Sequence, residues 1–334
     1  KICSLGVKIY HLDMPTKTSL LTFFLLPYSL IKFFYLILKY KPQIVHSFLF
    51  QANFLSRFVK VVFPKTKIFC SERVVEKEKL WQIKFLRFTD FLVDKIWTNS
   101  NETKEFVIKE HKFNEKKIVI SPNMIDLNDI KIKFSSSEIK KELALKEGDF
   151  LVVSVGRLHR QKGYDLLIEI AKSFSGKIKY KNFRYLFAVI GDGEEYEDLL
   201  NYTKKLQVED YVKFLGYKEN VYDYINACDL FLLTSYWEGS PNVVLEALAL
   251  KKIVVSTKVE GVSEILNSDY LVNLNQERKD IIDKFVEKIY DVYKNKYDFK
   301  VCLNQNFDFY KYLPEFVIKE KFLYYYIDKN YYIL

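Results

Sequence analysis

The sequence predicts an α/β protein with two domains, each built on a doubly wound parallel sheet with helices on both faces. Its 334 residues are too many for one ordinary core and suit two domains of roughly 150 residues each. Short apolar runs rich in β-branched residues recur along the chain, with helical stretches between them. This alternation is the pattern of βαβ units in parallel sheets.

In the first half, the apolar runs predict four strands, with helices between them and a polar segment after them. We expect strands at 43–47, 67–71, 95–99 and 117–121, and helices near 50–63, 80–92 and 101–110. The segment 131–149 is polar and serine-bearing, and an apolar run begins only at its end. We therefore assign 1–130 to the first domain and interpret 131–149 as a linker with a leading helix.

The second half restarts the alternation at residue 150. Strands are expected at 150–155, 184–190, 211–216, 229–235 and 252–257. These runs are too apolar to leave one face of a sheet in water, so helices should cover both faces. The second domain is assigned to 150–305, and the aromatic-rich segment 306–334 is expected to form a helix that packs back on the first domain.

Cysteine usage indicates a reduced, cytoplasmic chain. Cys3, Cys70, Cys228 and Cys302 lie far apart and show neither metal-ligand nor CxxC spacing. Disulfides are therefore not expected.

Charge is distributed unevenly between the two halves. Residues 1–140 contain 24 Lys and Arg against 13 Asp and Glu, a net charge of +11, whereas the remainder carries −2. A basic half favours contact with something anionic, such as a membrane surface, a lipid phosphate or nucleic acid. A lysine-rich solubilising surface explains the same scattered charges equally well. A nucleic-acid binder is disfavoured because the sequence shows no recognition helix and no aromatic-basic repeat.

One apolar segment, Ser19 to Leu38, raises the question of a membrane. It is about long enough to cross a bilayer, but Pro27 interrupts the helix and Lys32 would cost roughly 3 kcal/mol at depth. A transmembrane span is thus the least favoured interpretation. A mostly buried domain helix and an interfacial helix that presses Phe and Leu side chains into a leaflet both remain.

Ligands of parallel sheets bind beyond the carboxyl ends of the strands, so the strand exits of the second half are the places to search for a site. The exit after 150–155 reads GRLHRQKG, with Gly156, Arg157, Lys162 and Gly163. Two cations beside glycines that allow close backbone approach make a plausible clamp for a diphosphate. A basic loop beside a helix is common, so this motif alone is weak.

A second exit carries GDG at 191–193. It lacks the third glycine of the dinucleotide fingerprint, because Tyr196 stands at that position. The following helix is rich in acids, which would occupy its positive end and repel phosphate. We interpret GDG as a tight strand-to-helix turn with a structural role.

The third exit, TSYWEGSPNVVLEALAL at 234–250, is the most informative. Ser240 followed by Pro241 predicts a helix with Ser240 as its N-cap and Pro241 as its first residue. Free amides at that helix start can receive phosphate oxygens, and no acid lies in the first turn to compete. Glu238 before the cap and Glu246 in the second turn place a carboxylate on each side of it. Their spacing alone is compatible with coincidence.

Four motifs in the same order resemble those of the family 4 glycosyltransferases. EGSPNVVLEAL contains a pair of glutamates with seven residues between them, which in that family marks retaining enzymes that use sugar nucleotides. The GRL…KG run at 156–163, the GDG at 191–193 and the Leu215–Gly216 pair match its other motifs. The resemblance implies the GT-B fold, in which two Rossmann-like domains face each other across a cleft.

Carried over by position, the resemblance implies a donor site in the second domain. Arg157 and Lys162 would neutralise the donor diphosphate, Glu246 would bind the ribose and Glu238 the transferred sugar. Two cations and a helix start can stabilise a departing diphosphate without a metal, and the sequence contains no D-x-D, so neither a metal nor a cofactor beyond the nucleotide-sugar co-substrate is expected. The expected donor-binding residues are Gly156, Arg157, Lys162, Gly216, Tyr217, Glu238, Gly239, Ser240, Pro241, Asn242, Val243 and Glu246.

The first half resembles the acceptor domain of the family more loosely. QIVHSFLFQANFLSR at 43–57 is similar to a strand and helix of that domain, and SPNMID at 121–126 resembles its PNGID. Phe48 stands where many members have a second histidine, and Met124 replaces the glycine. His46, counted among the catalytic candidates with Glu238, Arg157 and Lys162, is expected to orient the acceptor hydroxyl, as is Glu72. The structural alternatives are a core histidine at His46 and an ion pair of Glu72 with Arg73 or a neighbouring lysine.

Family members begin with a strand and a glycine-rich loop that this sequence does not show, so we expect the first βα unit to be missing from it.

The resemblance implies a retaining transfer, with UDP-sugars favoured as donors, to a glycan or lipid-linked acceptor in the synthesis of cell-surface polysaccharide or glycoconjugate. Retention in the family is thought to proceed by front-face attack. A cytoplasmic enzyme in peripheral contact with an anionic membrane is expected. The alternatives are a same-fold enzyme of different chemistry and a fragment that binds donor without turnover.

Overall fold

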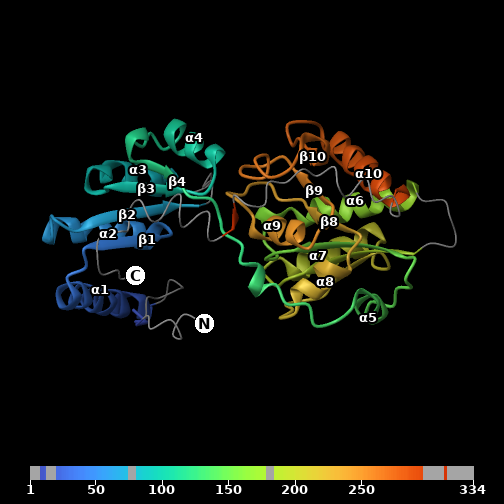
Figure 1. Ribbon diagram of the computed structural model, residues 1–334, viewed down its shortest axis with the longest axis horizontal. Coiled ribbons are helices and arrows are strands. Elements are labelled where there is room, and N and C mark those ends of the chain that lie inside the picture. The colour runs from blue at the N-terminus through green and yellow to red at the C-terminus, as the bar shows by residue number, and fades with distance from the viewer. Residues whose placement is uncertain (1–7, 13–19, 74–79, 178–183, 296–311, 314–334) are drawn as a thin grey trace.

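The chain folds into two α/β units, each with its own parallel sheet (Figure 1). The structure, a computed structural model, describes residues 8–12, 20–73, 80–177, 184–295 and 312–313. Every strand pair in these residues is parallel, which confirms the predicted fold class. Residue 130 lies between the two sheets, and residue 150 is the first residue of the second sheet.

The first sheet has the order β1-β2-β3-β4, so its strands follow one another in space as in sequence. Its strands are β1 (Ile44–Phe48), β2 (Lys67–Glu72), β3 (Lys95–Thr98) and β4 (Ile118–Ile120). The helices of this unit are α1 (Leu20–Tyr40), α2 (Phe50–Val62), α3 (Leu80–Phe88) and α4 (Asn101–Lys109), with short 3-10 turns η2 (Asp90–Leu92), η3 (Glu115–Lys117) and η4 (Leu127–Asp129). Each strand lies where an apolar run predicts it.

The second sheet has the order β10-β9-β8-β5-β6-β7. The chain runs outward from β5 to β7 and then returns to the other side of β5, so the strand order reverses between β5 and β8. Its strands are β5 (Phe150–Val155), β6 (Tyr185–Ile190), β7 (Val212–Phe214), β8 (Leu230–Leu233), β9 (Val254–Thr257) and β10 (Leu271–Val272). The two-residue strand β10 was not predicted.

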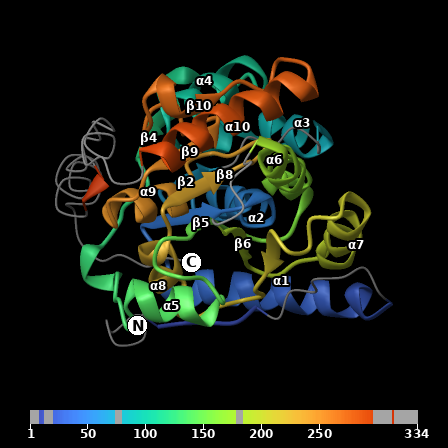
Figure 2. The ribbon, with the colours of Figure 1, turned by 90° about the vertical axis from the view of Figure 1, so that its right-hand side faces the viewer.

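Helices cover both faces of the second sheet, as its apolar strands require (Figure 2). Alternate strand residues point to opposite faces. Val152 belongs to one buried cluster and Val153 to the other. Helices α6 and α10 pack on the first face, and α5, α8 and α9 on the second. Their bounds are α5 (Ser136–Glu142), α6 (Tyr164–Lys177), α7 (Tyr196–Leu206), α8 (Val221–Ala227), α9 (Asn242–Ala249) and α10 (Arg278–Lys294), with 3-10 turns η5 (Arg160–Lys162) and η6 (Ser268–Tyr270).

The leading helix expected in the linker is α5, and it belongs to the second unit. A capping box starts it, because the Ser135 side chain accepts from the Glu138 amide and the Glu138 side chain accepts from the Ser135 amide. Ile139 and Leu143 are buried in the second unit's core. The predicted C-terminal helix at 306–334 lies outside the described residues, except for Tyr312 and the residue after it. The Tyr312 carbonyl accepts a hydrogen bond from the Ile125 amide at 2.9 Å.

Helix α1, which covers the apolar segment, has one buried face and one exposed face. Phe33 and Ile37 are buried against the first sheet. The outward face carries exposed apolar side chains at helical spacing, namely Tyr28, Ile31, Tyr35 and Leu38. Of the helices in the described parts of the chain, none combines the length and the apolar character that crossing a membrane requires.

Candidate functional site

The strand-order reversal of the second sheet brings two predicted motifs together. In open parallel sheets the ligand crevice lies outside the carboxyl ends of the strands at such a reversal. Strand β5 leads into the Gly156–Gly163 loop, and its neighbour β8 leads into the loop that contains Glu238. The topology therefore places both loops at one edge of the sheet, although they lie far apart in sequence.

An ion pair joins the two loops. Lys162 Nζ lies 2.6 Å from Glu238 Oε1, and that same oxygen accepts from the Ser235 hydroxyl at 2.7 Å. Glu238 is buried, whereas Lys162 retains some exposure. Two predicted catalytic residues are thus in direct contact, with the carboxylate fixed by a cation on one side and a hydroxyl on the other.

Hydrogen bonds to backbone carbonyls hold the two loops together. The Tyr236 amide donates to the Gln161 carbonyl at 2.8 Å, and Gln161 Nε2 donates to the Trp237 carbonyl at 2.9 Å. Gly156 provides room for this arrangement, because a Cβ there would lie 3.2 Å from Lys162 Cε and 3.0 Å from the Tyr164 hydroxyl. A side chain at residue 156 would therefore disturb Lys162 directly.

Helix α9 starts later than the sequence predicts. Ser240 was expected as the N-cap, but the cap position is held by Pro241, without a side-chain capping bond, and the helix begins at Asn242. Ser240 is buried, and its carbonyl accepts a hydrogen bond of 2.6 Å from Asn123 Nδ2 in the first unit. The Ser240 carbonyl is therefore bonded to a side chain of the first unit. The first turn of α9 contains no acid, as predicted.

Glu246 lies in the second turn of α9 and faces a tyrosine. Tyr222 OH donates to Glu246 Oε1 at 3.5 Å, which is a long contact. Burial raises the pKa of the Glu246 carboxyl, and the tyrosine opposes that shift. A half-buried carboxylate with one weak partner retains acceptor capacity for two further hydroxyl groups.

The remaining predicted donor residues surround this core of the site. Arg157 is exposed directly after β5, and in the described part of the chain it has no ion-pair partner. Gly216 follows β7 with a φ of 67°, and its carbonyl accepts from the Gly191 amide at 2.9 Å. Tyr217 is exposed, and Val243 is half-buried in the first turn of α9.

The GDG turn has the structural role that its acidic helix predicts. Gly191 has a φ of 141°, and a Cβ there would lie 1.9 Å from the Gly156 carbonyl oxygen. The turn therefore packs against the backbone of the Gly156 loop, which only glycine permits.

On the first unit, His46 is a buried strand residue. Its Nε2 lies 2.9 Å from the Ser71 hydroxyl, and its ring stacks on Phe48 with centroids 4.6 Å apart. Burial, with a smaller contribution from the nearby Arg73 cation, lowers the pKa of His46 to about 4. The imidazole is therefore neutral at physiological pH, and its surroundings are those of a packed core residue.

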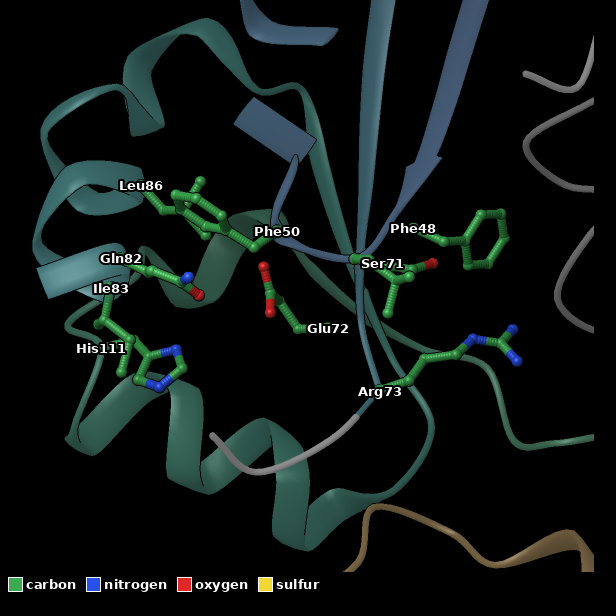
Figure 3. A pocket seen from close by; sticks show the side chains of 10 residues that line it. Phe48, Phe50, Ser71, Glu72, Arg73, Gln82, Ile83, Leu86 and His111 are labelled. Atoms are coloured by element: carbon green, nitrogen blue, oxygen red, sulfur yellow. The ribbon is translucent and has the colours of Figure 1, made fainter. Parts of the chain in front are cut away.

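Glu72 faces a cavity of about 140 Å³ at the carboxyl ends of β1 and β2 (Figure 3). Its Oε1 accepts from Asn53 Nδ2 at 3.1 Å. Burial raises the pKa of Glu72 to about 7, despite the opposing effects of Arg57 and Asn53. The cavity is lined by Phe48, Leu49, Phe50, Ser71, Glu72, Arg73, Gln82, Ile83, Leu86 and His111. A carboxyl that titrates near neutrality in a mainly apolar pocket can exchange a proton with a bound hydroxyl.

Sequence reasoning missed the contacts that join the two units. Asn123 Nδ2 donates to Asn242 Oδ1 at 2.7 Å as well as to Ser240. Glu264 accepts from the Glu102 amide at 3.0 Å, and Glu102 accepts from the Gly261 amide at 2.6 Å. Most of these bonds use backbone atoms, which leave no residue-type signal. Asn123, inside the SPNMID motif, and its partners Ser240 and Asn242, inside EGSPNVVLEAL, are the residues of these contacts that lie in recognised motifs.

The described residues contain no group of three or more His, Cys, Asp or Glu side chains that could hold a metal ion.

Comparison with known proteins identifies the family. A family model described as glycosyl transferases group 1 matches residues 135–308, which is just over half of the chain. The chain belongs to this family. The match covers both loops of the ion pair and the whole of α9.

Two curated relatives extend this similarity into the first unit of the group 1 glycosyltransferase. The chain is 28% identical over 280 residues to the UDP-Gal:alpha-D-GlcNAc-diphosphoundecaprenol alpha-1,3-galactosyltransferase of Escherichia coli, covering 80% of this chain and 70% of that protein. It is 27% identical to the N-acetylgalactosamine-N,N'-diacetylbacillosaminyl-diphospho-undecaprenol 4-alpha-N-acetylgalactosaminyltransferase of Campylobacter jejuni, covering 84% and 78% respectively.

Solved structures show the GT-B fold of this glycosyltransferase. The Anabaena protein Alr3699/HepE in complex with UDP-glucose superposes with a TM-score of 0.69 at 18% identity, over 87% of this chain and 81% of that one. The lipopolysaccharide outer core galactosyltransferase WaaB, in its apo form, gives a TM-score of 0.62 at 18% identity, over 90% and 79%.

Proposed function

We propose that this group 1 glycosyltransferase transfers a sugar, with retention of its anomeric configuration, from a UDP-sugar to a lipid-linked or glycan acceptor. The observation that carries the proposal is the Lys162–Glu238 pair, which sets a cation beside a buried carboxylate that lies in the loop before the acid-free start of α9. The named relatives, whose acceptors are diphosphoundecaprenol-linked, and the UDP-glucose complex of the Anabaena protein support this choice of substrates.

In the proposed reaction the bond between the sugar C1 and the β-phosphate oxygen breaks, and its electron pair leaves with UDP. The acceptor oxygen forms its bond to C1 on the same face, and its proton passes to a phosphate oxygen. Arg157, Lys162 and the α9 amides would stabilise the charge on the departing diphosphate without a metal ion. Glu246 would hold the ribose hydroxyls, and Glu238 those of the transferred sugar.

The acceptor is assigned to the first unit. Glu72 lines the cavity at the ends of β1 and β2, and its raised pKa suits a hydrogen bond with an acceptor hydroxyl. His46 is buried and neutral, so we assign it to shaping the wall beside Phe48.

A lipid-linked acceptor would require contact with a membrane. The exposed face of α1, with Lys32 and Lys39 placed over its tyrosine rings, suits an anionic surface.

A thermal-shift screen against sugar nucleotides, followed by product analysis, tests the proposal. A ligand at one hundred times its dissociation constant stabilises the fold by about 2.7 kcal/mol, so UDP-sugars should raise the melting temperature clearly. NMR of the product should then show an α-linkage from an α-linked donor. An inverted linkage would overturn retention, and stabilisation without turnover would favour a chain that only binds donor.

A further inference from the structure

Arg73 lies at the carboxyl end of β2, on the side of the first unit that meets the second. Figure 3 shows its side chain pointing away from Glu72 and toward the same side as Phe48. The guanidinium carbon lies 5.2 Å from the centroid of the Phe48 ring. Arg73 therefore belongs to the strand exit that lines the acceptor-side cavity, but its charge is directed elsewhere.

The backbone of Arg73 touches the donor loop. Its carbonyl oxygen accepts from Asn99 Nδ2 at 2.9 Å, and a Cβ added to Gly239 would lie 1.7 Å from that oxygen. Gly239 directly follows Glu238, so residue 73 is fixed next to the residue proposed to hold the transferred sugar.

The side chain of Arg73 reaches the start of α9 through one intermediary. Its Nη1 donates to Asn123 Oδ1 at 3.3 Å, while Asn123 Nδ2 donates to the Ser240 carbonyl at 2.6 Å and to Asn242 Oδ1 at 2.7 Å. The guanidinium is thus one side chain away from the first residues of the phosphate-facing helix, although it comes from the opposite unit.

The charge of Arg73 is not balanced by an acid in the described part of the chain. No carboxylate there lies within ion-pair distance, and the bond to Asn123 uses one of the five guanidinium N–H groups. Partial burial lowers the pKa of Arg73, with no acid opposing the shift, yet arginine stays charged at neutral pH. The residue remains exposed, so a ligand can reach it.

We propose that Arg73 binds a phosphate group of a substrate and adds a cation from the acceptor-side unit to the two supplied by the donor-side unit. The proposal rests on the proposed function. A planar guanidinium suits two-pronged contact with phosphate oxygens, and the adjacent helix start favours negative charge. The phosphate comes either from the donor diphosphate or from a diphosphate that carries the acceptor sugar, and both would present the same oxygens to Arg73.

Substitution of Arg73 tests the proposal with two measurements. Arg73→Gln removes the charge and keeps an amide donor for Asn123, and Arg73→Lys keeps the charge but loses the two-pronged geometry. Arg87→Gln is the matched control, because Arg87 is exposed on α3 and pairs with no substrate group in the proposal. Calorimetry with UDP and with inorganic pyrophosphate measures the donor arm. The KM for a short-chain alkyl diphosphate-linked sugar, against the same sugar as an alkyl glycoside, measures the acceptor arm.

A lost charge-assisted contact corresponds to a loss of about tenfold or more. If the donor supplies the phosphate, Arg73→Gln should weaken UDP and pyrophosphate binding by that factor. If the acceptor supplies it, UDP binding should hold while the KM for the diphosphate acceptor alone rises. The affinity or KM of Arg73→Lys should lie between the values of Arg73→Gln and the wild type. The proposal is overturned if Arg73→Gln, folded by circular dichroism, stays within twofold of the wild type in both arms. UDP binding without sugar transfer by the wild type would instead contradict the proposed function.

Discussion

Lys162 and Glu238 form an ion pair with 2.6 Å between Nζ and Oε1, although 76 residues separate them in sequence. Each is expected to contact a different part of the donor, and in the ion pair each neutralises the charge of the other. A bound diphosphate would therefore compete with Glu238 for the lysine. The carboxylate is also held by Ser235, so its position does not depend on Lys162 alone.

Substitution of Glu246 and of Glu238 should have different effects on UDP binding and on turnover. Glu246→Ala should weaken UDP binding by about tenfold or more, because it removes an acceptor for the ribose hydroxyls. Glu238→Ala should leave UDP binding intact or tighter, since Lys162 is released for the diphosphate, while kcat falls. Calorimetry with UDP and steady-state kinetics separate these effects.

Tyr222→Phe is the control for Glu246, because it removes only the long 3.5 Å contact to that carboxylate. It should bind UDP nearly as well as the wild type. Equal losses of UDP affinity in Glu238→Ala and Glu246→Ala would refute the assignment of their roles.

Arg157→Ala should lower turnover roughly a hundredfold or more, because a charge removed from a catalytic site costs about 3 kcal/mol of transition-state stabilisation. Arg157→Lys should be milder but still harmful, since an ammonium cannot reproduce two-pronged contact. Activity of the wild type should survive chelation. Loss of activity in EDTA with recovery in manganese, or normal turnover by Arg157→Ala, would show that the metal-free mechanism is wrong.

The raised pKa of Glu72 predicts a pH-dependent stability. Between its ordinary value of 4.5 and about 7, the folded chain holds a proton that the unfolded chain has lost, so the free energy of unfolding should fall as pH rises through this range. We expect the free energy of unfolding to fall by about 1 to 3 kcal/mol. The range allows for solvent that reaches Glu72 through the cavity. Urea denaturation at pH 5 and pH 7.5 measures it, and Glu72→Gln should remove it.

His46 contributes to the pH dependence of the free energy of unfolding with the opposite sign. Its pKa of about 4 lies below the ordinary 6.5, so its contribution to stability grows as pH rises between these values. The difference between wild type and Glu72→Gln isolates the glutamate, because His46 is common to both. Glu209→Gln, at an exposed position, should behave as the wild type. An unchanged pH dependence in Glu72→Gln would contradict the assignment.

The exposed face of α1 should bind anionic membranes. Ile31 is 70% exposed there, and Ile31→Ser should reduce flotation with vesicles that contain phosphatidylglycerol without lowering stability by more than about 0.5 kcal/mol. Ile132→Ser, which changes the same residue type at an exposed position outside α1, is the matched control. Equal recovery of the wild type with neutral and anionic vesicles at low salt would refute anionic membrane contact.

The sequence predicted the features that depend on buried apolar runs and on single loops. Every described strand except β10 lies at an expected apolar run, and β10 was missed because two residues carry no periodicity. Both strand-exit motifs were found, but their pairing depends on β8 returning beside β5, which local patterns do not specify. The start of α9 was predicted one residue too early, and the contact of the Ser240 carbonyl with Asn123 of the other unit was not predicted.

The close packing around Gly239 has a consequence for how such enzymes can change their acceptors. A Cβ at Gly239 would overlap the Arg73 carbonyl, and one at Gly261 would lie 1.9 Å from the Gly239 carbonyl oxygen. The loop that contains Glu238 and Gly239 is thus seated on main-chain atoms of both units, with the Asn99 side chain beside them. In a chimera that joins this donor half to a foreign acceptor half, the foreign main chain would set the position of the Glu238 loop. The loop would keep its present position only if the backbone at the Arg73 position is retained unchanged.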